Sequence, residues 1–192
     1  MRPRARIVTI AVLAAIALAA VVALFGRASE DGTRIVRERP IAFNLRVPDA
    51  MREVEPGPGE WLRVERPNRD SLTVSGLELP AYTGDVNGIL PIAAARELDK
   101  LKQQFPNLEL VEEGKARINK VAGYTMAFRV SRSPREYGRL VLLPRPEPGA
   151  RDGVKLLLLA NPEAGAGKAA DVGSRGLLKT PYRSFRFGTE GP

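Results

Sequence analysis

The chain has 192 residues, of which 44% are hydrophobic, 27% charged and only 6% aromatic. Thirty lysines and arginines against 22 acidic residues give a net charge of +8, and the sequence contains no cysteine and no histidine. These absences exclude disulfides, cysteine nucleophiles, zinc sites of cysteine and histidine, serine–histidine triads and histidine-ligated haem.

The first feature in chain order is an uncharged apolar run, 7–25, which follows a basic tail, 1–6. As a helix this run would be about 28 Å long, close to the roughly 30 Å hydrocarbon core of a bilayer. It is longer than the apolar part of most signal peptides, so it predicts an uncleaved single-pass transmembrane anchor of the signal-anchor type. The alternative is a cleaved signal peptide with small residues at Gly26 and Ala28, which would leave a secreted domain.

The arginines on the two sides of this run are nearly balanced, so the positive-inside rule alone does not orient it. A short basic tail is typical of a signal segment, and long domains cross the membrane largely regardless of charge. We therefore expect a cytoplasmic tail at 1–6 and, at the cell membrane, a domain outside the cytoplasm. Residues 26–40 are polar and contain Gly32 and Pro40, which predicts a juxtamembrane linker.

The expected domain, 41–187, opens with alternating apolar residues over Ile41–Val47, and Pro48 ends this strand. Alternation returns at Trp61–Glu65 and at Ser71–Leu79. In the last of these segments the apolar phase changes at Gly76, which predicts a β-bulge there.

A helix is predicted from Pro91 to Phe105, with Pro91 in its first turn. Its apolar residues fall on one stripe, and they are Ala94, Leu98, Leu101 and Phe105. We expect this stripe to pack on a sheet beside Tyr124, Met126 or Phe128.

The second half of the chain adds further strands. Alternation predicts strands around 108–112 and within 115–130. Two apolar runs follow at 137–143 and 154–160, on either side of a proline- and glycine-rich loop. They indicate a hairpin of central strands. A weak helix over 168–179 and a last strand over 182–187 complete the order. Because long βαβ alternation is missing, the predicted class is α+β, with a mainly antiparallel sheet flanked by helices.

One motif resembles a phosphate-binding loop. An apolar strand is followed by Gly165-x-Gly167-x-x-Ala170, but too few residues follow for a dinucleotide-binding unit with its ribose-binding acid. A Walker-type loop is also excluded, because Pro162 and Ala169 stand where glycine and serine or threonine are needed. A turn before a helix is the better interpretation.

Local carboxylate pairs at Glu53 with Glu55 and at Glu112 with Glu113 have no surroundings that would separate their pKa values for acid–base work. Without residues 1–29 the charge falls to +4, and no basic patch or stacking pattern for nucleic acid is found. The sequence therefore predicts no catalytic, cofactor-binding or metal-ligating residues and no nucleic-acid partner.

Three stretches resemble the PsbP-like superfamily, which includes photosystem II extrinsic subunits and mycobacterial lipoproteins. They are an opening strand that ends in proline (41–48), a strand pair with a central glycine, Gly123 (117–129), and a short helix followed by a Ser-Phe-x-Phe strand (177–187). The resemblance implies an α/β/α sandwich over about 41–187 and an accessory or binding role, and it brings no active residues with it.

We therefore expect a membrane-anchored, extracytoplasmic binding or accessory domain that is not an enzyme and has an envelope protein as partner. A carrier of a lipid or small hydrophobic ligand is one alternative. A hydrolase with a carboxylate or serine–lysine site assembled from distant segments is the other.

Overall fold

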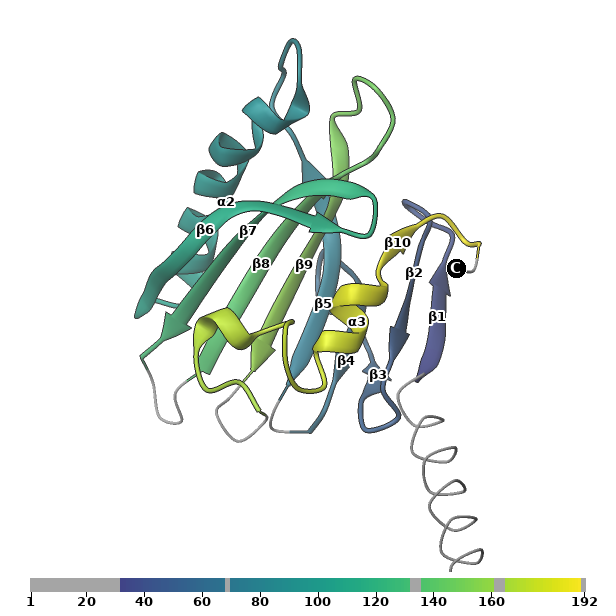
Figure 1. Cartoon of the computed structure of the whole chain (residues 1–192), viewed down its shortest axis with the longest axis vertical. Coiled ribbons are helices and arrows are strands. Elements are labelled where there is room, and N and C mark those ends of the chain that lie inside the picture. Colours follow the sequence, from purple (N-terminus) through teal and green to yellow (C-terminus); the bar gives the residue numbers. More distant parts are fainter. Residues whose placement is uncertain (1–31, 68–69, 132–135, 161–164, 191–192) are drawn as a thin grey trace, which may run out of the picture.

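The computed structural model describes residues 32–67, 70–131, 136–160 and 165–190. Within them lie a seven-stranded sheet, a three-stranded sheet, a long helix and a short one, an α+β architecture (Figure 1). The tail 1–6 and the expected anchor 7–25 lie outside the described residues. Inside them, no helix is both long enough and apolar enough to cross a membrane.

The large sheet is antiparallel throughout, in the order β3-β4-β5-β9-β8-β7-β6. Its strands are β3 (Arg52–Val54), β4 (Glu60–Glu65), β5 (Ser71–Glu78), β6 (Leu108–Ile118), β7 (Val121–Val130), β8 (Glu136–Pro144) and β9 (Asp152–Ala160). The two apolar runs predicted as a hairpin are β8 and β9, and they occupy the centre of the sheet. Their nearly continuous apolar sequence reflects burial on both faces.

The predicted bulge at Gly76 is wrong. Strand β5 pairs with β9 without interruption from Ser71 to Glu78, and the irregularity lies on β4, between Glu60 and Leu62. The apolar phase of β5 changes because Leu72 and Val74 face one core and Leu77 faces the other. Glycine is required at position 76 because a Cβ atom there would lie 2.8 Å from Cζ2 of Trp61.

Helix α2 (Leu90–Gln104) agrees with the predicted helix to within one residue at each end, and Pro91 lies in its first turn. It follows a single 3₁₀ turn, η1 (Val86–Gly88). As predicted, its apolar stripe packs on β7, where Leu101 joins Met126 and Phe128 in one core. The rings of Phe105 and Phe128 are 6.5 Å apart between centroids.

The opposite face of the large sheet is covered by the small sheet, β1-β2-β10. Its strands are β1 (Thr33–Arg37), β2 (Phe43–Val47) and β10 (Arg186–Phe187). Strand β1 falls in the segment expected to be a linker, 26–40, so the folded domain begins before Ile41. The strand was missed because polar residues surround Ile35, which packs inward against the core.

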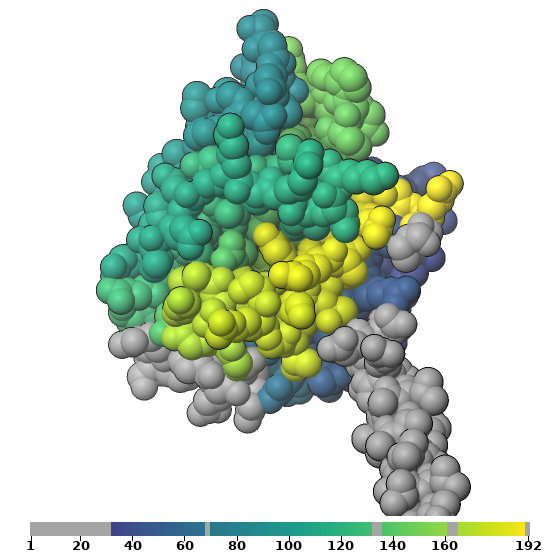
Figure 2. Space-filling model, viewed as in Figure 1, coloured from purple at the N-terminus to yellow at the C-terminus, as the bar shows by residue number. Residues whose placement is uncertain are grey.

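The predicted helix over 168–179 is not present. Only one 3₁₀ turn, η3 (Ala169–Asp171), forms there, because Gly173 and Gly176 adopt left-handed φ values of 77° and 66°. The last strand is also shorter than predicted, since α3 (Lys179–Ser184) takes the first three residues of 182–187 and the strand only the last two. Figure 2 shows this C-terminal segment lying across the front of the molecule.

Arg139 on β8 fixes the C-terminal segment to the sheet. Its guanidinium donates hydrogen bonds to the carbonyl oxygens of Ala170 (3.1 Å) and Val172 (2.7 Å). The third layer, on the face of the large sheet opposite α2, is therefore a small sheet with turns and a short helix, which packs on the apolar core and is also fixed by side chain to backbone hydrogen bonds.

Replacing Leu101 with alanine should lower the free energy of unfolding by about 2–5 kcal/mol, because it removes buried methyl groups from the helix–sheet core. Chemical denaturation of the variant and the wild type measures this difference. Lys102→Ala, one residue further along the same helix and exposed, is the matched control and should change it by less than about 0.5 kcal/mol. Equal losses in the two variants would contradict the packing described here.

Candidate functional site

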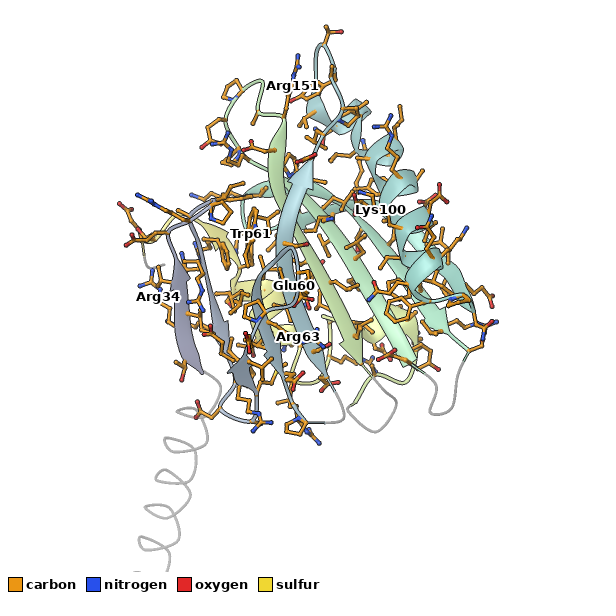
Figure 3. All side chains as sticks on the ribbon, turned by 180° about the vertical axis from the view of Figure 1, so that it is seen from behind. Arg34, Glu60, Trp61, Arg63, Lys100 and Arg151 are labelled. Atoms are coloured by element: carbon orange, nitrogen blue, oxygen red, sulfur yellow. The ribbon has the colours of Figure 1, made fainter. Side chains whose placement is uncertain are left out.

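Helix α2 covers only part of its face of the large sheet. Where it packs, over β6 to β9, the residues that face it are apolar. On β4 and the adjoining part of β5 the residues on this face are polar, and they are Glu60, Arg63, Glu65, Thr73 and Ser75. In Figure 3, which looks onto this face, α2 with Lys100 lies to one side and β4 with Glu60 and Arg63 to the other.

A groove lies between α2 and this polar part of the sheet. It consists of a hollow of about 550 Å³ beside the end of β5 and a second of about 290 Å³ beside the start of β4. The two hollows share Gly76, Glu97, Lys100 and Lys155. We call this site the Glu97 groove.

An ion-pair cluster occupies the centre of the Glu97 groove. The two carboxylate oxygens of Glu97 accept hydrogen bonds from Nζ of Lys100 (2.7 Å) and Nζ of Lys155 (2.8 Å). The Glu97 side chain is only 12% exposed and that of Lys155 20%, whereas Lys100 is 65% exposed. Lys100 follows Glu97 by one helical turn, and Lys155 reaches it from β9.

Two opposing effects set the pKa of Glu97. Burial raises it by penalising the charged form, and the hydrogen bonds from the two lysines outweigh burial and lower it below its ordinary value. The carboxylate is therefore charged at neutral pH, and both lysines are held in place by it.

The groove brings together a serine and a lysine, the residue types of one of the predicted alternatives. Ser75 and Lys155 are directly opposite each other on β5 and β9. A serine nucleophile needs a lysine whose amine is free to accept its proton, but Nζ of Lys155 already donates a hydrogen bond to the Glu97 carboxylate. Among the described hydrogen bonds, none joins Ser75 to Lys155.

The carboxylate pairs considered from the sequence lie elsewhere. Glu53 is on β3 and binds the guanidinium of Arg37, while Glu112 and Glu113 are exposed on β6. The described residues hold no group of three or more acidic side chains that could bind a metal ion. The glycine motif leads from Gly165 into η3, which is too short to provide a helical phosphate site.

A further hollow of about 390 Å³ lies among loops, lined in part by Tyr82, Lys120 and Arg145. The hydroxyl of Tyr82 donates to the carbonyl oxygen of Ala150 (3.0 Å), and Arg145 is paired with Asp152 (2.7 Å). These polar groups stabilise the loops themselves. The Glu97 groove, with its buried carboxylate, is the stronger candidate site.

Sequence reasoning did not identify the Glu97 groove, although two signals for it were present. Glu97 interrupts the apolar stripe of α2 three residues after Ala94, and Lys155 interrupts the apolar run of β9. A charged residue on an expected buried face needs a partner of opposite sign, and these two are each other's partner.

The depressed pKa of Glu97 predicts a loss of stability in acid. Because the folded state holds the proton more weakly than the unfolded chain, this carboxylate contributes stability above its ordinary pKa of 4.5, and the contribution is lost as the pH falls through the lower folded value. Glu97→Gln should therefore flatten the fall in the free energy of unfolding below about pH 4.5. Urea unfolding at a series of pH values measures this, and curves for wild type and variant that stay parallel would contradict it.

At neutral pH, Lys155→Met should destabilise the domain by about 1–3 kcal/mol, because it leaves a charge-assisted hydrogen bond of Glu97 unmade. Lys102→Met, at an exposed position of α2, is the matched control and should have little effect. The double variant Glu97→Leu/Lys155→Met replaces the pair with apolar groups and should recover much of the loss. A double variant less stable than Lys155→Met would contradict this account of the pair.

No family model matches the chain, and no curated protein sequence matches it. Among solved structures, cyanobacterial PsbP (CyanoP) from Synechocystis sp. PCC 6803 is similar with a TM-score of 0.55 and 16% sequence identity, over 81% of this chain and 91% of that one. LpqN of Mycobacterium tuberculosis, described as involved in cell envelope biogenesis, has a TM-score of 0.53 and 13% identity over the same shares of the two chains.

The likeness spans most of the described domain and nearly all of each of these two proteins. At 13–16% sequence identity this likeness shows the fold alone. The resemblance first seen in three short stretches of sequence is thus confirmed in three dimensions, and the chain has a PsbP-like fold.

Proposed function

We propose that this chain is an accessory domain that stands outside the cytoplasm, is held at the cell membrane by its segment 7–25, and binds a protein partner through the Glu97 groove without catalysing a reaction. The observation that carries the proposal is the groove itself, a recess on the part of the sheet face that helix α2 leaves uncovered. The envelope-related description of LpqN supports the location.

The chemistry of the hollows supports binding of a polar partner. Charged side chains line all three hollows described above. The two apolar cores are formed by buried side chains, with Phe43, Phe128 and Phe185 among the largest of them. Carriage of a lipid would need an apolar cavity, so this alternative has less support than binding at the groove.

The arrangement of the groove also supports binding without catalysis. The buried carboxylate of Glu97 accepts hydrogen bonds from two ammonium groups, so it is neither a free base nor a proton donor. A lysine tied to a carboxylate does not activate the neighbouring serine. These groups remain able to form further hydrogen bonds with a partner, because each ammonium has three donors.

The membrane topology can be tested with reporter fusions in cells. Alkaline phosphatase joined after Pro192 should be active, because it folds outside the cytoplasm, and alkaline carbonate extraction should leave the protein in the membrane fraction. A cytoplasmic reporter active at the same junction would contradict the orientation. A soluble product that begins near Ser29 would show that the segment is a cleaved signal peptide.

The groove can be tested with a photo-crosslinking amino acid in the full-length chain in its native membrane. At Gln104, which lines the groove, irradiation should give a discrete crosslinked protein. Gln103 is adjacent, exposed and outside the groove lining, so the same amino acid there is the matched control and should give no such product. The same product from both positions, or none from Gln104, would contradict the proposed site.

A further inference from the structure

The direction of the backbone groups of β5 determines what the groove offers to a partner. In the turn between β4 and β5, the amide of Arg66 donates to the carbonyl of Asp70 (2.8 Å), and beyond the other end of β5 the amide of Leu79 donates to the carbonyl of Arg151 next to β9 (2.8 Å). Backbone groups alternate in direction along an antiparallel strand. The even-numbered residues of β5 therefore direct their N–H and C=O groups toward β4, and the odd-numbered ones toward β9.

Strand β4 is too short to pair with all of β5. It begins at Glu60, opposite Ser75, because a tight turn precedes it. In this turn the amide of Glu60 donates to the carbonyl of Gly57 (3.0 Å), and the amide of Gly57 donates to the Glu60 carboxylate (2.8 Å). Among the described residues no strand lies beside Glu78 on this side, so its N–H and C=O groups open into the groove.

The wall opposite this open edge is positively charged. Arg96, Lys100 and Lys155 line the hollow beside the end of β5 together with Glu78 and Glu97, a net charge of +1. Glu97 is already bound to both lysines, and the guanidinium of Arg96 has no hydrogen bond or ion pair with any described residue. Arg96 precedes Lys100 by one helical turn, so two cations border the hollow on the α2 side.

We propose that the Glu97 groove receives an extended acidic segment of a partner protein, which adds as a short strand to β5 beside Glu78 and places a carboxylate against Arg96 and Lys100. This inference names the chemical class of the partner for the function proposed above and rests on that function. The open edge supplies main-chain hydrogen bonds, as in other cases of strand addition, and the cations select for acidic side chains. The segment would continue the line of β4 past its tight turn.

The proposal can be tested with the full-length chain in detergent micelles and a fluorescein-labelled pentapeptide in which glutamate and threonine alternate. Fluorescence anisotropy should show saturable binding. A peptide with lysine in place of glutamate should bind about fivefold more weakly, the upper size expected for one exposed ion pair. The glutamate peptide with N-methyl groups on alternate amides should lose about tenfold or more, because it cannot make its main-chain hydrogen bonds.

Variants of the protein separate the contribution of the ion pair at Arg96 from that of the main-chain hydrogen bonds at Glu78. Arg96→Gln should weaken binding of the glutamate peptide up to about fivefold, whereas Lys102→Gln, on the exposed side of α2, should not. Glu78→Pro removes the open N–H without breaking a bond to β9 and should weaken binding of the glutamate peptide about tenfold, because a carbonyl of the peptide loses its donor. Glu78→Ala removes only the exposed side chain and should bind the glutamate peptide as the wild type does. Circular dichroism confirms that each variant is folded.

Equal binding of the glutamate, lysine and N-methylated peptides would overturn the proposal, and so would equal effects of Arg96→Gln and Lys102→Gln. This failure can be told apart from failure of the proposed function. If Gln104 crosslinks to a partner in membranes while the peptides show no preference, the groove binds a partner of another kind.

Discussion

In the described part of the chain, helix α2 packs on one face of the seven-stranded sheet and is too small to cover all of it. The 15 residues of α2 span about 22 Å and a helix is about 10 Å wide, whereas seven strands spaced about 4.8 Å apart extend over about 29 Å. The apolar residues of the sheet gather beneath α2, and the strands beyond it carry polar ones. The boundary between these two regions is the Glu97 groove.

Two further features of the groove follow from this limited coverage. A carboxylate at the edge of the helix–sheet contact is partly withdrawn from water, so Glu97 is stabilised by lysines from both α2 and β9. The open end of β5 lies in the same recess, because β4 begins at Glu60, opposite Ser75, directly after the turn that the Glu60 side chain stabilises, and so does not extend along β5 to Glu78. Unlike the opposite face, which the small sheet and α3 cover, this side keeps both backbone groups and charges accessible.

Most of the large sheet and helix α2 could be predicted from the sequence, because their periodicity reflects burial on one or both faces. The N-terminal strand could not, since β1 contributes little apolar surface of its own and is stabilised by pairing with β2. The C-terminal segment was misread because the alternating aromatic residues Phe185 and Phe187 suggested a longer strand, whereas Pro181 and Tyr182 lie in α3. The groove combines residues far apart in the chain. Only the two charged residues inside apolar patterns, Glu97 and Lys155, indicated it.

Binding of a partner segment as proposed requires that β5 keep one edge open beside α2. Residue-resolved amide hydrogen exchange of the full-length chain in micelles tests it most directly, because neighbouring amides of β5 point in opposite directions. We expect slow exchange at the amide of Leu77, which bonds toward β9, and fast exchange at the amide of Glu78, which should become slow when the acidic peptide is bound. Slow exchange at both amides in the free chain, or fast exchange at Glu78 in the saturated complex, would contradict it.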